Sequence, residues 1–114
     1  MRDFVRIFKA LSDPNRLRIL KMLEVKPLAV CEITAILGLA TSTVSKHLSI
    51  LRDAGLIIDE KDGKWVNYKL SKGARNWFSN QLLGLLSEHL GEDETIQEDA
   101  KKAHLVDRFV ICKR

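Results

Sequence analysis

With 114 residues, of which 46% are hydrophobic and 30% charged, the chain is expected to fold as a single globular domain rather than stay disordered. No apolar run approaches the ~20 residues needed to cross a bilayer, and the amino terminus lacks a signal-peptide pattern. We therefore expect a cytoplasmic protein that has no membrane partner.

Positive charge is concentrated in the first two thirds of the chain. Residues 1–75 hold fourteen Lys and Arg against eight Asp and Glu, whereas residues 76–114 hold five against seven. The formal net charge of +4 is compatible with a nucleic-acid partner but is weak evidence by itself. The uneven distribution indicates that such a partner would bind the first part of the chain.

Three short helices are predicted before residue 40. The first covers residues 4–11 and is amphipathic. The second begins after Asp13, a typical N-cap, with Pro14 in the first helical position, and Lys26-Pro27 breaks it. The third runs from about residue 30 to 37, and Gly38 ends it.

Residues 41–55 predict a fourth helix whose two faces differ in chemistry. Val44, Leu48 and Leu51 recur at i, i+4 and i+7, so they form one apolar stripe. The other side chains of its first turns are small hydroxyls, a lysine and a histidine, which suit the major groove of DNA. Thr41 is the expected N-cap and Gly55 the left-handed stop. Together with the third helix, this segment predicts a helix-turn-helix with a recognition helix.

A change of period after the fourth helix predicts a β-hairpin. Residues 56–58 are β-prone, Asp62-Gly63 is a two-residue turn signal, and residues 65–70 alternate. A hairpin directly behind a helix-turn-helix is a wing, and Lys61 and Lys64 lie beside its tip, where they can contact phosphates or the minor groove. The side chains expected to face the core are Val66, Tyr68 and Leu70, and those expected to face outward are Trp65, Asn67 and Lys69.

The last long helix is predicted to begin near Ser71 or Lys72 and to end at about Leu90. It carries two apolar stripes, and only one of them has an obvious partner within so small a domain. We therefore expect a homodimer in which this helix and the terminal helix at Phe4, Ile7 and Phe8 form the shared surface. The alternative is a helix buried on all sides within one protomer.

The fold class predicted from these elements is mainly α with a small β-hairpin, a winged helix-turn-helix. Residues 1–91 are predicted as the DNA-binding and dimerisation domain. Residues 92–114 are predicted as an acidic-then-basic tail with room for one short helix around Leu105, Phe109 and Cys112. Two cysteines so far apart in sequence do not indicate a disulfide framework, so a reducing compartment is expected.

Four strings in this order resemble a known family. They are FKALSDPNRLRIL at residues 8–20, TVSKHL at 43–48, LRDAGL at 51–56 and GKWVNYKL at 63–70. Over residues 4–72 the chain resembles ArsR/SmtB-type repressors. The resemblance implies a homodimeric winged-helix protein that occupies double-stranded operator DNA, expected to be an imperfect inverted repeat, until an inducer releases it.

By position, the family's base-reading residues fall on the start of the fourth helix, at Thr41, Ser42, Thr43, Ser45, Lys46 and His47. Hydroxyls there can bond to base edges or phosphates, and a lysine suits guanine or phosphate. The alternative of a protein-binding winged helix predicts a hydrophobic or acidic face instead. A regulator that binds DNA constitutively is a further alternative. No enzyme activity is expected, because a Cys31–His47 pair lacks an orienting acid and an oxyanion donor motif.

The inducer site is incomplete by the family's patterns. Arsenic-responsive members carry Cys-Val-Cys at the start of the third helix, where this chain keeps Cys31, and the Asp-x-His pair of zinc-responsive members is absent. Cys31 at a helix amino terminus favours a thiolate. With Cys112, and with His104, His89 or water, it can bind arsenite or another soft metal ion. Thiol oxidation, persulfide uptake and no sensing at all stay open as alternatives, and no cofactor is required.

Overall fold

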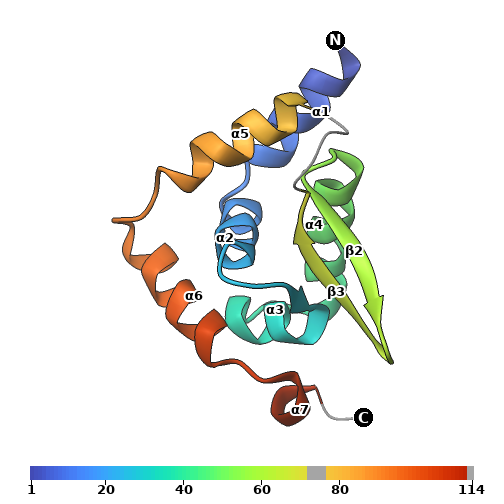
Figure 1. The fold of residues 1–114 in the computed structure, drawn as a ribbon, viewed down its shortest axis with the longest axis vertical. Helices are drawn as coiled ribbons and strands as arrows, with labels where there is room; N and C mark the ends of the chain where they lie inside the picture. The colour runs from blue at the N-terminus through green and yellow to red at the C-terminus, as the bar shows by residue number, and fades with distance from the viewer. Residues whose placement is uncertain (72–76, 113–114) are drawn as a thin grey trace.

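A helix-turn-helix with a β-hairpin beside it forms the centre of the molecule, and the carboxyl-terminal helices wrap around one side (Figure 1). The computed structural model describes residues 1–71 and 77–112. Its elements in chain order are α1 (Arg2–Leu11), α2 (Pro14–Leu23), β1 (Leu28–Ala29), α3 (Val30–Leu37), α4 (Thr41–Asp53), β2 (Ile57–Asp62), β3 (Trp65–Leu70), α5 (Trp77–Ser87), α6 (Glu94–Leu105) and α7 (Arg108–Ile111). The mainly α architecture with a small hairpin is as predicted. None of the helices in the described part of the chain is long and apolar enough to span a membrane.

Local signals in the sequence set the helix ends. The Asp13 carboxylate accepts hydrogen bonds from the backbone N–H groups of Asn15 (2.8 Å) and Arg16 (3.2 Å), which confirms it as the N-cap of α2. Gly38 and Gly55 lie after α3 and α4 with φ of 71° and 78°, a left-handed conformation that glycine adopts without steric cost. The start of α2 and the ends of α3 and α4 therefore lie where the sequence predicts.

The N-cap of α4 lies one residue earlier than predicted. Ala40 has the extended backbone of a capping residue, and no side chain caps this helix end. Thr41 is already helical and its side chain is exposed. The prediction of Thr41 as the cap is therefore wrong, and its hydroxyl is available for another partner.

The core lies between α2, α3, α4 and the base of the hairpin. The predicted stripe of α4 is fully buried there, with Val44, Leu48 and Leu51 at most 1% exposed. Their principal companions are Ile19, Leu20, Leu28, Ile33, Leu56 and Ile57. Because this stripe is anchored in the core, the opposite face of α4 must face solvent.

The sheet has three strands in the order β1-β3-β2, all antiparallel. Asp62 pairs with Trp65, so the two-residue loop is Gly63-Lys64, one position later than the predicted Asp62-Gly63 turn. The strand β1 pairs with β3 through Leu28 and Tyr68, and sequence reasoning missed it. A strand of two residues is too short to show any alternation.

The predicted facing of the hairpin side chains is wrong near its tip. Val66 is 39% exposed, whereas Trp65 is half-buried. Near the tip, β3 extends past the domain core, so Val66 has no apolar layer to face. Tyr68 and Leu70, nearer the base, do pack against the core as predicted.

The carboxyl-terminal third of the chain holds more structure than predicted. Of the two predicted starts of the last long helix, Ser71 is not helical and Lys72 lies outside the described residues, and α5 ends at Ser87 rather than Leu90. Beyond it, residues 92–114 were predicted as a tail with room for one short helix, but their described part forms α6 and α7. Asp93 caps α6, and Ile96 and Ala103 bury one face of that helix. The helix α6 packs on α2 and α3, and α7 packs on α3.

Candidate nucleic-acid interface and cysteine pair

The first turns of α4 present a small, polar and basic surface. Thr41, Ser42, Thr43, Ser45 and Lys46 are all exposed, because Val44 and Leu48 hold the opposite side in the core. Short hydroxyl side chains let a helix backbone come close to base edges, and the lysine adds a positive charge. The structure therefore brings five of the six predicted recognition residues together on one face.

His47 differs from its neighbours because it is half-buried and has a protein partner. Its Nδ1 lies 3.1 Å from Nη1 of Arg16. The Arg16 guanidinium also donates to the backbone carbonyls of Ala10 (2.9 Å) and Lys9 (3.1 Å). Arg16 thus links the end of α1 to the recognition helix. Sequence reasoning did not single out Arg16, although it stands in the string at residues 8–20 that carries the family resemblance.

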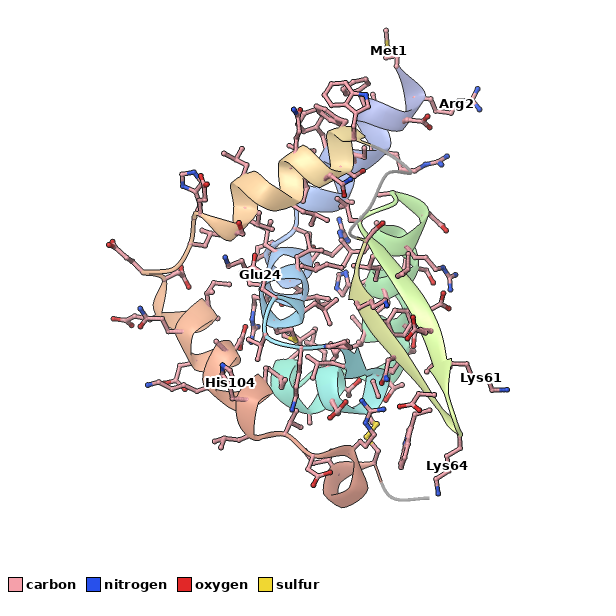
Figure 2. The ribbon with its side chains drawn as sticks, viewed as in Figure 1. Met1, Arg2, Glu24, Lys61, Lys64 and His104 are labelled. Atoms are coloured by element: carbon pink, nitrogen blue, oxygen red, sulfur yellow. A yellow bond between two sulfur atoms is a disulfide. The ribbon has the colours of Figure 1, made fainter. Side chains whose placement is uncertain are left out.

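The β2–β3 hairpin, called the wing below, places two lysines at its outer end. Lys61 and Lys64 are exposed, and Figure 2 shows both side chains extending away from the protein near the tip. The Lys64 ammonium lies 5.2 Å from the centroid of the Trp65 ring, a cation–π contact. The strand β2 packs beside α4, so the wing and the recognition helix form one continuous side of the molecule (Figure 1).

The two cysteines are joined to each other. Cys31 in the first turn of α3 and Cys112 after α7 form a disulfide across 81 residues, with their Cα atoms 5.6 Å apart. The prediction that two cysteines so far apart make no disulfide framework is therefore wrong, and the pairing of Cys31 with Cys112 by thiol oxidation, kept open as an alternative, is the state that the structure shows. The physical reason is tertiary: α6 turns back along α2 and α3 and brings the end of the chain to Cys31.

The structure assembles no obvious metal centre around this pair. Among residues 1–71 and 77–112, no three His, Cys, Asp or Glu side chains lie in a group that could hold an ion. His89 and His104, predicted as possible further ligands, are both exposed, and Figure 2 shows His104 on α6. A metal ion at this site would have to rely on the two sulfur atoms, once reduced, and on water.

An apolar surface lies on the side formed by α1 and α5. We call it the α1–α5 face, and its exposed members are Phe4, Val5, Phe8, Trp77 and Leu85. The ring of Phe78 joins the two helices within the protomer, with its centroid 4.3 Å from that of Phe4 and 6.0 Å from that of Phe8. Ile7, predicted on the shared surface, is instead 2% exposed and belongs to the core of the protomer.

Comparison with known proteins gives consistent matches. Residues 13–59 match the sequence model of a family described as bacterial regulatory protein, arsR family. The chain is 40% identical over 74 residues to the arsenical resistance operon repressor of Escherichia coli (strain K12), across 64% of this chain and 63% of that protein. It thus spans slightly less than two thirds of that relative's length. The arsenical resistance operon repressor of Bacillus subtilis (strain 168) is 37% identical over 91 residues, which cover 79% of this chain and 80% of that protein.

A solved structure shows the same architecture. It is the homodimeric winged helix-turn-helix DNA-binding domain of Mb0332 from Mycobacterium bovis, described as a possible ArsR-family transcriptional regulator. It superposes with a TM-score of 0.65 at 26% sequence identity, over 76% of this chain and 77% of that one.

Proposed function

This chain belongs to the arsR family of bacterial regulatory proteins, and from that premise we propose that it is a DNA-binding transcriptional repressor that an inducer releases from its operator. The predicted family and the predicted winged helix-turn-helix are both confirmed by the matches. A cytoplasmic location stays a prediction.

The exposed face of α4 carries the proposal. Thr43, Ser45 and Lys46 offer hydrogen-bond donors and acceptors without a large apolar or acidic group among them. A winged helix that binds another protein would need an apolar or acidic contact surface here. The exposed lysines of the wing add positive charge on the same side, which favours a phosphate backbone as the partner.

We propose that the α1–α5 face joins two copies of the chain. Contiguous exposed apolar side chains on a soluble domain commonly mark a protein–protein contact. Trp77 is 67% exposed and Phe8 54%, and the structurally similar Mb0332 domain is described as homodimeric. A two-fold dimer would present two α4 helices, so an inverted repeat with half-sites about one DNA turn (~34 Å) apart is expected.

The test of DNA binding is a fluorescence-anisotropy titration of the purified protein onto the DNA upstream of its own gene, against scrambled DNA of equal length. Lys64→Ala is expected to weaken binding to both DNAs alike and to lower the slope of log K against log salt by about 0.9 for each lysine removed, or about 1.8 for the proposed dimer. Thr43→Ala and Lys46→Ala are expected to lower the preference for the upstream DNA. Lys101→Ala on the exposed side of α6 is the matched control and should change neither.

Two results would contradict the proposal. One is the absence of binding to either DNA in low-salt buffer. The other is an equal loss on both DNAs for the two α4 variants, since that would remove the evidence for base reading.

We further propose Cys31 and Cys112 as the inducer site. The disulfide between them favours thiol oxidation over the alternatives: two thiols give up two protons and two electrons, hydrogen peroxide accepts them, and two waters leave. In the reduced state the same two sulfurs could bind arsenite or another soft metal ion, as the names of the arsenical relatives suggest. Metal binding or disulfide formation must be more favourable in the DNA-free state of the protein than in the DNA-bound state. A ligand with equal affinity for both states would leave the DNA-binding equilibrium unchanged.

The candidate inducers are distinguished by adding arsenite, cadmium or hydrogen peroxide, each in a separate experiment, to the reduced protein–DNA complex. A change in affinity that is lost in both Cys31→Ser and Cys112→Ser supports the site. Unchanged release in both variants would exclude the cysteines, and a wild-type complex that responds to none of the three would indicate a constitutive repressor.

A further inference from the structure

Arg108 in α7 contacts three residues from two different parts of the fold. Its Nη2 lies 3.3 Å from Oε1 of Glu32 in α3, and its Nη1 lies 3.8 Å from Oδ2 of Asp62 at the tip of the wing. Its guanidinium carbon is 5.6 Å from the centroid of the Trp65 ring. We call Arg108 with these three partners the C-terminal clamp.

The clamp is largely shielded from water. The Arg108 side chain is 15% exposed and that of Glu32 is 3% exposed. Glu32 is itself fixed, because its carboxylate accepts a 2.8 Å hydrogen bond from the backbone N–H of Ala29. Charge pairs and cation–π contacts weaken less with salt when they are shielded in this way. The contact with Asp62, which is exposed and longer, contributes less.

Two attachments hold Arg108 in place. The Cys31–Cys112 disulfide ties the chain to α3 four residues after Arg108. Before α7, the Lys26 ammonium donates a 3.1 Å hydrogen bond to the carbonyl of Val106. Figure 1 shows α7 below α3, near the end of the hairpin, and Figure 2 shows the sulfur–sulfur bond between them. Because α7 is only four residues long, it has little stability of its own and depends on these attachments.

The wing needs an external support. Near its tip it extends past the domain core, and Val66 on one side of β3 is exposed. On the other side, the Trp65 ring is partly covered by Arg108. Lys61 extends away from the clamp, and Lys64 is exposed although its ammonium lies 5.2 Å from the centroid of the Trp65 ring, so both lysines stay available to phosphate while the clamp is closed (Figure 2).

We propose that Arg108 is a positioning residue for the wing, and that the Cys31–Cys112 disulfide holds Arg108 in position. The oxidation state of the two cysteines then sets how firmly the wing is held against α3. Reduction by a dithiol gives two protein thiols and the cyclic disulfide of the reductant, and it frees α7 and Arg108 from the wing. The consequence for DNA rests on the proposed function, whereas the movement of the wing does not.

The movement of the wing is measured from the fluorescence of Trp65. Trp77→Phe leaves Trp65 as the only tryptophan, because the chain contains just these two. In this background, dithiothreitol is expected to shift the Trp65 emission to longer wavelength and to increase its quenching by acrylamide. Arg108→Met should show the shifted emission before reduction and no further change after it. Cys112→Ser, which keeps Arg108 but removes the tether, should match the reduced protein.

Two further variants make the result specific to the clamp. Arg108→Lys keeps the charge but loses the planar contact with the ring, so it should lie between the parent protein and Arg108→Met. Lys101→Met removes an exposed cation from α6 and should behave as the parent does. If neither reduction nor Arg108→Met changes the Trp65 emission, the proposal that the clamp positions the wing is wrong, whether or not the protein binds DNA.

The consequence for DNA is measured as the ratio of dissociation constants between oxidised and reduced protein on the upstream DNA. For the wild-type protein, the oxidised form is expected to bind about 5- to 150-fold more weakly than the reduced form, in the direction that the proposed function requires. In Arg108→Met that ratio should fall towards one, because the oxidation state of the cysteines no longer affects the wing through Arg108. A ratio that Arg108→Met leaves unchanged, or a parent ratio of one, would overturn the coupling. If neither form of the parent binds DNA, the proposed function fails, while the Trp65 measurement still decides the clamp.

Discussion

The ion pair between Arg18 in α2 and Asp99 in α6 gives a direct test of how the carboxyl-terminal helices are held. Asp99 is 1% exposed, and its two carboxylate oxygens accept hydrogen bonds of 2.8 and 3.0 Å from Nε and Nη2 of Arg18. This is the bidentate geometry in which an arginine–carboxylate pair is strongest. Asp99→Ala is expected to destabilise the protein by removing both bonds.

The size of the effect follows from the burial of the two partners. Removing one member of a fully buried pair costs about 3–5 kcal/mol, because the other charge is left without a partner. The Arg18 side chain is 23% exposed and keeps a 3.4 Å contact with Asn15, so water relieves part of that cost. We therefore expect about 2 kcal/mol for Asp99→Ala. Asp99→Asn, which keeps the volume and one acceptor, should cost less.

The measurement is urea unfolding of the oxidised protein, followed by circular dichroism. With an m-value of about 2 kcal/mol per M, Asp99→Ala should lower the midpoint by about 1 M. Glu98→Ala, the exposed neighbour on α6, is the control and should change the free energy of unfolding by less than about 0.5 kcal/mol. If Asp99→Ala proves no more destabilising than Glu98→Ala, the ion pair does not hold α6 and the reasoning is wrong.

Arg18 also determines how this contribution depends on pH. The hydrogen bond to Asp99 raises the pKa of the Arg18 guanidinium, against the opposing effect of burial. A raised pKa in the folded state gives stability that is fully present at lower pH and is lost only as pH rises through that pKa. The contribution of Arg18 to the free energy of unfolding should therefore be constant from neutral to mildly alkaline pH.

Three further predictions concern the dimer, a helix end and the disulfide. Phe8→Glu on the α1–α5 face should shift the protein from dimer to monomer in analytical ultracentrifugation, whereas Glu98→Lys on α6 should not; a dimer that persists in Phe8→Glu would exclude this face. Gly55→Ala should lower the free energy of unfolding, measured in urea, by about 1–2 kcal/mol, because a left-handed φ of 78° strains alanine. A steric clash is not the cause, since the added Cβ would meet only the Ser79 hydroxyl at an ordinary 3.8 Å. An unchanged midpoint would mean that this backbone conformation is not required. Cys112→Ser should lower the free energy of unfolding by about 4.5 kcal/mol relative to the oxidised protein, from the chain entropy of a closed loop with a separation of 81 residues, and adding a reductant to this variant should change nothing more.

The recognition helix shows what periodicity predicts well. Val44, Leu48 and Leu51 repeat at helical spacing, and that repeat alone decides which face is buried and which is left for DNA. Helix ends at Asp13, Gly38 and Gly55 were equally predictable, because capping depends on residues within one turn of each other.

The carboxyl-terminal third shows where such reasoning stops. The helix α6 is polar on most of its surface, and Ile96 and Ala103 alone form too thin a stripe to separate it from a tail. Arg18 and Asp99 lie 81 positions apart, and so do Cys31 and Cys112. A pairing over that distance leaves no periodic trace in the sequence.

The sequence by itself therefore determined the recognition helix, its supporting helices, the wing and the family, because each depends on contacts between near neighbours or on an ordered set of short strings. The tertiary structure alone decided that α6 and α7 pack back on α2 and α3, that the two cysteines meet, and that Arg108 reaches Glu32, Asp62 and Trp65. Those contacts depend on the path of the chain in space, and they bring Arg108, four residues before the disulfide-bonded Cys112, against the wing.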